Sequence, residues 1–171
     1  MNVSVLHTTE YNNFYQTYIS KVQEHDLITC LNNNLNSTLE LLQGLTAEKF
    51  NFAYAEGKWT IKELLQHIID TERIFAIRAL RIARNDKTML PGFDQDEFNE
   101  TAEANSKLKQ DLIEDYAASR LNTISLFKSI SSTNFANIGG ASGNPLTARA
   151  AAFIIIGHEN HHIEILKSRY L

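Results

Sequence analysis

Two histidines near the C-terminus have the spacing of a metal-binding pair. His158 and His162 are four residues apart, so on a helix they lie on one face, one turn from each other. Two imidazoles in that arrangement can bond to the same metal ion. We therefore expect a metal site on the helix that contains them.

The residues from His158 to His162 also read as H-E-x-x-H, the metalloprotease signature in which the glutamate is the general base. Those enzymes take a third ligand from downstream of the motif, and only Ile163–Leu171 follows it here, with Glu164 too close on the same helix. The chain also lacks the strand pattern that holds a peptide substrate. We therefore reject a zincin, although Glu159 keeps a motif-based claim as the base of a hydrolase.

Glu159 and His162 also form one Glu-x-x-His pair of the kind found in di-iron carboxylate bundles. Such proteins need a second pair and two further inward glutamates, and no second Glu-x-x-His exists in this chain. The pattern therefore favours a site for a single metal ion.

A third histidine, His67, lies in the middle of another predicted helix, among leucines and isoleucines that should face the protein interior. Three imidazoles buried in one small core without a metal would each need separate hydrogen-bond partners. We therefore predict that His67, His158 and His162 together bind one divalent metal.

Three residues close to these histidines are not expected to bind the metal themselves. Asp70, one turn after His67, either accepts the other N–H of that imidazole or forms an ion pair with Arg73. Trp59 is expected to be a packing residue. His161 is turned about 60° from His158 around the helix, so we expect it beside the site or at the surface.

The elements that must position these residues are helices. Apolar residues repeat at helical spacing in long segments around only two prolines, which predicts an all-α four-helix bundle. We expect long helices at about residues 27–44, 60–84 and 106–130, the second starting in a capping box of Thr60 and Glu63. A last long helix should start from a cap at Asn144-Pro145 or at Thr147 and end near Tyr170. A short extra helix at 11–22, a loop at 85–105 and a Gly-rich link at 139–143 complete the prediction, and the last helix should be the most buried.

The composition limits the remaining possibilities. The 171 residues suit a single domain, 1–171, with its core bundle at about 24–170, and a net charge of −4 gives no basic patch for nucleic acid. The longest apolar run, Ala150–Ile156, is too short for a membrane span, and we expect a cytoplasmic protein. The single cysteine, Cys30, should be buried and unreactive, while His7 and His25 should be exposed.

Two motifs, residues 56–67 (EGKWTIKELLQH) and residues 157–162 (GHENHH), resemble the DinB/YfiT-like superfamily of metal-binding four-helix bundles, with the likeness covering about Leu27–Tyr170. The resemblance implies that His67, His158 and His162 bind the metal. The family includes thiol S-transferases that use bacillithiol, mycothiol or glutathione, a maleylpyruvate isomerase branch and proteins without a known reaction. Homodimers are common in it, so a homodimer is possible here.

Three neutral imidazoles leave Zn²⁺ or Ni²⁺ with an open position, which lowers the pKa of a bound thiol or water toward neutrality. We therefore expect a metal-dependent enzyme that activates a low-molecular-weight thiol for S-transfer to a small-molecule substrate. The alternatives are a metal-dependent hydrolase and a metal-binding or stress-response module without catalysis.

Overall fold

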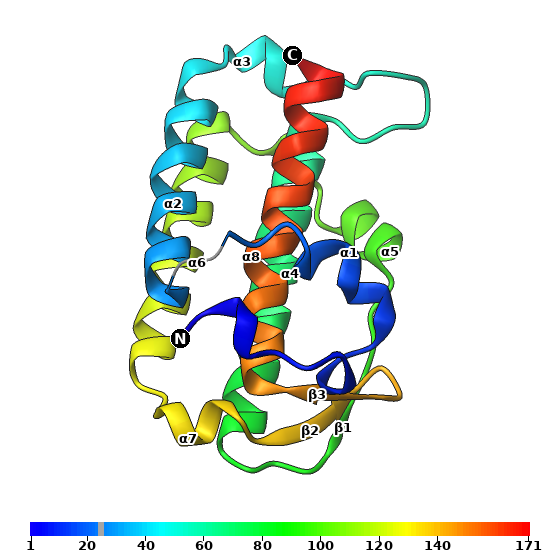
Figure 1. The fold of residues 1–171 in the computed structure, drawn as a ribbon. Helices are drawn as coiled ribbons and strands as arrows, with labels where there is room; N and C mark the ends of the chain where they lie inside the picture. Colours follow the sequence, from blue (N-terminus) through cyan, green and yellow to red (C-terminus); the bar gives the residue numbers. More distant parts are fainter. Residues whose placement is uncertain (24–25) are drawn as a thin grey trace.

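The computed structural model describes residues 1–23 and 26–171, which form a four-helix bundle (Figure 1). The bundle helices are α2 (Leu27–Gly44), α4 (Ile61–Ala83), α6 (Lys109–Lys128) and α8 (Ala148–Ile165), and α8 continues as a π-helical segment, Leu166–Tyr170. Helix α4 packs against α8 and α6, and α2 packs against the same two helices. The predicted bundle is confirmed, and α8 is its most buried helix, since every residue from Ala150 to Glu159 is buried.

The helix starts follow from local side-chain caps. The Thr60 hydroxyl accepts a hydrogen bond from the Glu63 backbone N–H, and the Glu63 carboxylate accepts one from the Thr60 N–H, which confirms the predicted capping box. Thr147 caps α8 by accepting from the Ala150 N–H. Helix α6 begins at Lys109 rather than near Ser106, because a 3-10 turn, Ala104–Ser106, precedes it.

The fold is not strictly all-α, which corrects the predicted class. Strands β2 (Ile138–Ala141) and β3 (Asn144–Thr147) form an antiparallel hairpin, and β1 (Met89–Leu90) pairs with β2 in parallel, at the end of the bundle where α8 starts (Figure 1). The hairpin turn has two residues with positive φ, Ser142 at 51° and Gly143 at 77°. That backbone is typical of type I′ turns, so the Gly-rich link is a hairpin and not a loop.

The predicted loop at 85–105 also contains regular structure. Besides β1 it includes helix α5 (Gln95–Thr101), which packs against α4. The Asp94 carboxylate accepts from the N–H groups of Asp96 and Glu97, so part of the acidic group is a helix cap. Short helices α3 (Ala47–Phe50) and α7 (Ser132–Phe135) complete the connections.

The N-terminal segment is less helical than predicted. Three 3-10 turns (Val3–Val5, Thr8–Glu10 and Asn13–Tyr15) precede a short helix α1 (Gln16–Ile19), which replaces the expected helix at 11–22. Helix α1 packs directly on α8 at Gly157, where a Cβ would lie 2.1 Å from the Tyr18 carbonyl oxygen. This close approach requires glycine and brings Tyr18 beside the predicted metal pair.

Three smaller expectations concern exposure. Cys30 is buried in α2, as predicted, and its Sγ lies 3.7 Å from the Gln23 carbonyl oxygen. His7 is exposed as predicted, and His25 lies outside the described residues. Within residues 1–23 and 26–171 no helix is both long and apolar enough to cross a membrane.

Candidate metal centre

The three histidines predicted as ligands meet inside the bundle. Helix α8 presents His158 and His162 one turn apart, and α4 presents His67 from the facing helix. The Nε2 atoms of His67 and His158 are 2.9 Å apart, and those of His162 and His158 are 3.1 Å apart. All three side chains are buried. The i, i+4 spacing positions the pair, and the packing of α4 against α8 adds the third imidazole.

The three ring nitrogens cannot satisfy one another by hydrogen bonding. A neutral imidazole nitrogen has either one hydrogen or one lone pair, so the Nε2 of His158 can form a good hydrogen bond with only one of its two neighbours. A cation that accepts all three lone pairs satisfies the whole group at once. The residues therefore fit a divalent metal, and among the described residues no carboxylate or thiolate joins the group.

Burial keeps these imidazoles neutral. It lowers the pKa of His67 to about 4 and, together with the neighbouring His67 and His161, that of His162 to about 3. Burial and the other three imidazoles also lower the pKa of His158 well below 6.5. At neutral pH all three rings are therefore unprotonated, the form in which an imidazole can bind a metal.

Aromatic side chains surround the centre. The ring of Trp59 packs at 4.9 Å from that of His67, which agrees with its predicted packing role. The ring of Tyr18 lies 5.2 Å from that of His158 and 5.3 Å from that of His161. His161 is half-buried beside the group, as its direction on the helix predicts.

Asp70 takes the second of its two predicted roles. Its carboxylate accepts from the side-chain amide of Gln66 at 2.9 Å and lies 3.7 Å from the guanidinium of Arg73. The hydrogen bonds found for the described residues do not connect it to His67. The hypothesis that Asp70 orients His67 therefore gives way to the helix-surface ion pair.

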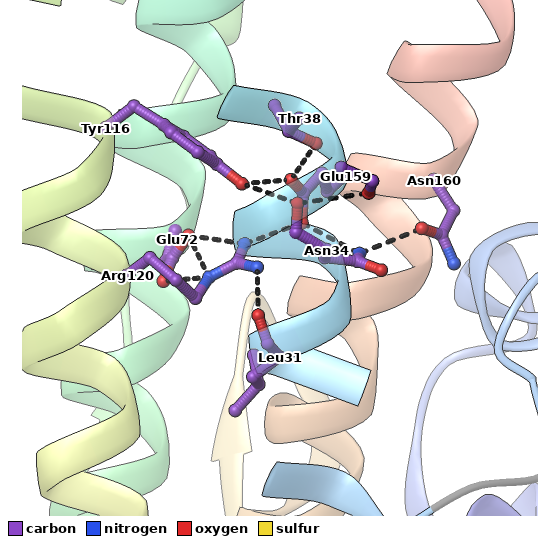
Figure 2. A network of polar contacts seen from close by, with 9 residues as sticks. Leu31, Asn34, Thr38, Glu72, Tyr116, Arg120, Glu159 and Asn160 are labelled. Carbon is purple, nitrogen blue, oxygen red and sulfur yellow. Dashed lines mark hydrogen bonds and ion pairs between the residues drawn. The ribbon is translucent and has the colours of Figure 1, made fainter. Parts of the chain in front are cut away.

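Glu159 lies in a separate polar network formed with side chains of α2 and α6 (Figure 2). One carboxylate oxygen accepts from Arg120 at 2.7 Å and Asn34 at 2.8 Å, and the other accepts from Thr38 at 2.9 Å and from the Tyr116 hydroxyl. Burial, the largest single influence, raises the pKa of Glu159, but the charge of Arg120 and the hydrogen bonds from Tyr116, Asn34 and Arg120 together outweigh it, so the pKa is lowered. The motif-based claim of Glu159 as a catalytic base is therefore wrong, because the carboxylate is engaged on another face of α8.

Arg120 is the centre of that network, and the sequence analysis missed it. Its side chain is completely buried, and its guanidinium donates to both carboxylate oxygens of Glu72 on α4 at 2.8 to 3.2 Å. It also donates to the Leu31 carbonyl of α2. Arg120 thus joins all four bundle helices (Figure 2). The sequence signal that could have found it was the pair of polar residues, Ser119 and Thr123, that lie with Arg120 among the apolar residues of α6 and are buried with it.

Two cavities border the histidines. The first, of about 360 Å³, is lined by His67 and His158 together with side chains of α1, α4 and the segment around α5. The second, of about 330 Å³, is lined by His162 and Trp59. Asp96 of α5 lines both cavities and is exposed. Small molecules can therefore reach the centre from two sides, and both approaches pass an acidic side chain.

Comparisons with known proteins agree with this architecture. No curated protein matches the chain. A solved structure with the same fold, YfiT from Bacillus subtilis, aligns with a TM-score of 0.68 and 16% sequence identity, covering 82% of this chain and 84% of YfiT. YfiT is described as a probable metal-dependent hydrolase with an unusual four-helix bundle topology. The family model of the DinB superfamily matches residues 31–166, and the chain therefore belongs to the DinB superfamily.

Proposed function

We propose that this chain is a metal-dependent enzyme that acts on a small molecule and holds zinc or nickel through His67, His158 and His162. The observation that supports it best is the convergence of three buried, neutral imidazole nitrogens. A structural zinc site is normally closed by four protein ligands, whereas three ligands keep a position for chemistry. A divalent metal bound there would supply Lewis acidity that lowers the pKa of a water or thiol toward neutrality.

Hydrolysis is the reaction that the surroundings favour first. Hydrolysis requires a group near the metal that accepts a proton from water. Asp96 is the candidate for this group, because its carboxylate lines both of the cavities that border the histidines. Its side chain is exposed and has no charged partner among the described ion pairs. The description of YfiT as a probable metal-dependent hydrolase points in the same direction. In this proposal Asp96 replaces Glu159 as the base.

Thiol S-transfer is the second candidate, and the presence of two cavities favours it. A transferase must hold a thiol cofactor and an electrophile at once, and the histidines lie between cavities of about 360 and 330 Å³. Cys30 lines neither cavity, so the thiol would be an external low-molecular-weight one. The segment at 85–105 contributes Asp96 to both cavities.

The metal content of the purified, untagged protein tests the proposal, measured by mass spectrometry. We expect about one metal ion per chain. In the cobalt-substituted form, a new thiolate-to-metal charge-transfer band on adding glutathione would favour S-transfer. A spectrum indifferent to glutathione, with turnover of an ester or amide panel, would favour hydrolysis. Protein without metal would refute the proposal. Bound metal without turnover of any substrate would favour the alternative of a metal-binding module without catalysis.

Asp96→Asn tests the assignment of the base. We expect the rate of hydrolysis to fall by about a hundredfold, the usual contribution of a positioned base, with the metal content unchanged. Glu97→Gln is the matched control, because Glu97 is an exposed neighbour on α5 that lines neither cavity. An equal loss in both variants would remove Asp96 from the mechanism.

The cytoplasmic location, the small-molecule substrate and the possible homodimer remain predictions that belong to this proposal. So does the expectation that neither nucleic acid nor a membrane is a partner.

A further inference from the structure

A buried arginine without an acidic partner lies in the wall of the larger cavity. Arg78 of α4 is only 3% exposed and lines the same cavity as His67 and His158. No ion pair among residues 1–23 and 26–171 includes it. Arg120 on α6 is also buried, with no exposed surface, but it is paired with two glutamates. Burying a charged side chain costs free energy unless an opposite charge compensates it. The described residues do not supply an anion for Arg78, so we expect a ligand to supply it.

The contacts that Arg78 does make hold it in place without neutralising it. One guanidinium nitrogen, Nη2, donates to the Pro91 carbonyl at 2.7 Å and lies 3.4 Å from the Ser142 hydroxyl. The guanidinium carbon is 4.8 Å from the centre of the Phe75 ring and 5.9 Å from that of Phe93. The Tyr15 side chain adds a further hydrogen-bond contact to the guanidinium. A guanidinium has five N–H donors in a planar fork, so these three contacts do not use all of them. Donors therefore remain for a ligand.

A second polar group in this cavity also lacks a partner. Thr71 is 3% exposed, and its hydroxyl has no hydrogen-bond partner among the described residues although it lines the cavity. His67, Thr71, Phe75 and Arg78 follow one another at steps of four, four and three, so they share one face of α4. The face extends about 16 Å along the helix from His67 to Arg78.

We propose that this face of α4 recognises the substrate, with Arg78 binding a carboxylate at the end of the molecule remote from the histidines. This inference names the substrate class of the proposed enzyme and rests on that function. Thr71 would hydrogen-bond to a polar atom in the middle of the molecule. The aromatic rings of Phe75, Phe93, Tyr15 and Tyr18, which line the same cavity, would pack against an apolar or aromatic body.

The charges at the cavity rim favour a carboxylate over a phosphate. Asp94 and Asp96 also line this cavity, so a dianionic ligand would meet more repulsion than a monoanionic one. The planar fork of an arginine matches the two oxygens of a carboxylate in a bidentate pair. The expected substrate is therefore an extended, monoanionic organic acid whose reactive group lies at the histidine end.

The test compares two probes of the same shape, 3-phenylpropanoate and its neutral amide 3-phenylpropanamide. Their dissociation constants are measured by ligand-observed NMR on the full chain, both zinc-loaded and metal-free. We expect the carboxylate to bind about ten- to a hundredfold more tightly than the amide, the range of a charge-assisted hydrogen bond. The metal-free arm matters because a carboxylate could otherwise bind the metal.

Variants assign the preference to Arg78. Arg78→Gln should abolish it, and Arg78→Lys, which keeps the charge without the fork, should keep part of it. Arg73→Gln is the control, because Arg73 is an arginine of the same helix that pairs with Asp70 and Asp115 outside the cavity. Thr71→Val keeps the side-chain shape and should leave the preference for the carboxylate unchanged, because neither probe has a polar atom in its middle for the Thr71 hydroxyl. If Arg78→Gln does not fold, Arg78→Lys still decides, because a full preference retained without the planar fork would contradict bidentate binding by Arg78.

Equal binding of the two probes to the unchanged protein would overturn the inference, and so would a full preference retained in Arg78→Gln. A phosphate monoester of the same body that binds more tightly than the carboxylate would overturn the choice of carboxylate. A carboxylate preference in protein that takes up no metal would refute the proposed function but not this site. Protein that takes up metal but shows no preference for the carboxylate would refute this site and leave the proposed function standing.

Discussion

Helix α8 contributes to two polar clusters through adjacent residues, His158 and Glu159, and the two clusters are built in opposite ways. On the histidine side, three neutral nitrogens face one point and cannot all be paired by one another. On the glutamate side, both carboxylate oxygens accept hydrogen bonds, and a buried arginine balances the charge. A buried polar cluster that the protein completes is structural, whereas one that it leaves incomplete indicates a ligand.

The completed cluster also positions the incomplete one. Arg120 links Glu72, five residues after His67 on α4, to Glu159, which follows His158 on α8. These bonds hold α4 and α8 at a fixed register, and that register brings the three imidazoles together. The ionic network is therefore a scaffold for the metal centre and not part of its chemistry.

The largest expected effect separates the two faces of α8 by metal binding. His158→Ala should weaken zinc affinity by more than about a hundredfold, because even outer partners of metal ligands contribute ten- to a hundredfold. His161→Ala should retain one metal ion per chain, since this half-buried ring stands beside the group. Competition with a chromophoric chelator measures both affinities. Equal loss in the two variants would show that the ligand pair on α8 has been misassigned.

The next effect concerns the completed cluster alone. Arg120→Met leaves the carboxylates of Glu72 and Glu159 buried without their cation, so we expect the free energy of unfolding to fall by about 3–5 kcal/mol. Arg73→Met removes an arginine from exposed ion pairs and should cost less than about 1 kcal/mol. Urea unfolding measures both values. A cost for Arg120→Met as small as that of the control would contradict the scaffold role.

The smallest effect is a difference in pH dependence. In the unfolded chain histidines take up protons near 6.5, whereas the folded metal-free protein holds His67 at a pKa of about 4 and His162 at about 3. Their contribution is therefore complete above pH 6.5 and is lost as the pH falls toward 4 for His67 and toward 3 for His162, by a few kcal/mol in order of magnitude. The lowered pKa of Glu159 places its loss below about pH 4.5. Urea unfolding in EDTA at a series of pH values checks both windows.

A double substitution tests whether His67 and His162 cause the loss of stability between pH 6.5 and 4.5. Replacing His67 and His162 together by glutamine should reduce the slope of the stability profile between pH 6.5 and 4.5, where His158 still contributes. The loss of stability caused by Glu159 below pH 4.5 should remain. The same slope in this double variant and in the unchanged protein would mean that other groups cause it.

Much of the frame was predictable from the sequence because it depends on short-range rules. The capping box of Thr60 and Glu63 and the cap at Thr147 are set by neighbours within three residues. The shared face of His158 and His162 follows from helical periodicity alone. His67 could be added to the predicted ligands because burying an imidazole in an apolar core costs free energy unless it has a hydrogen-bond partner or a metal.

Other features depend on partners far apart in the chain, and only the tertiary structure decided them. The direction of Glu159 depends on Arg120, 39 residues away, and the pairing of Arg120 with Glu72 spans 48. The small sheet depends on a turn at Ser142 and Gly143 that resembles a loop in composition. The sequence therefore determined the helices and the histidine pair, since spacing and caps act locally. Which buried charges are paired depends on the packing of distant helices, because compensation of a charge requires contact.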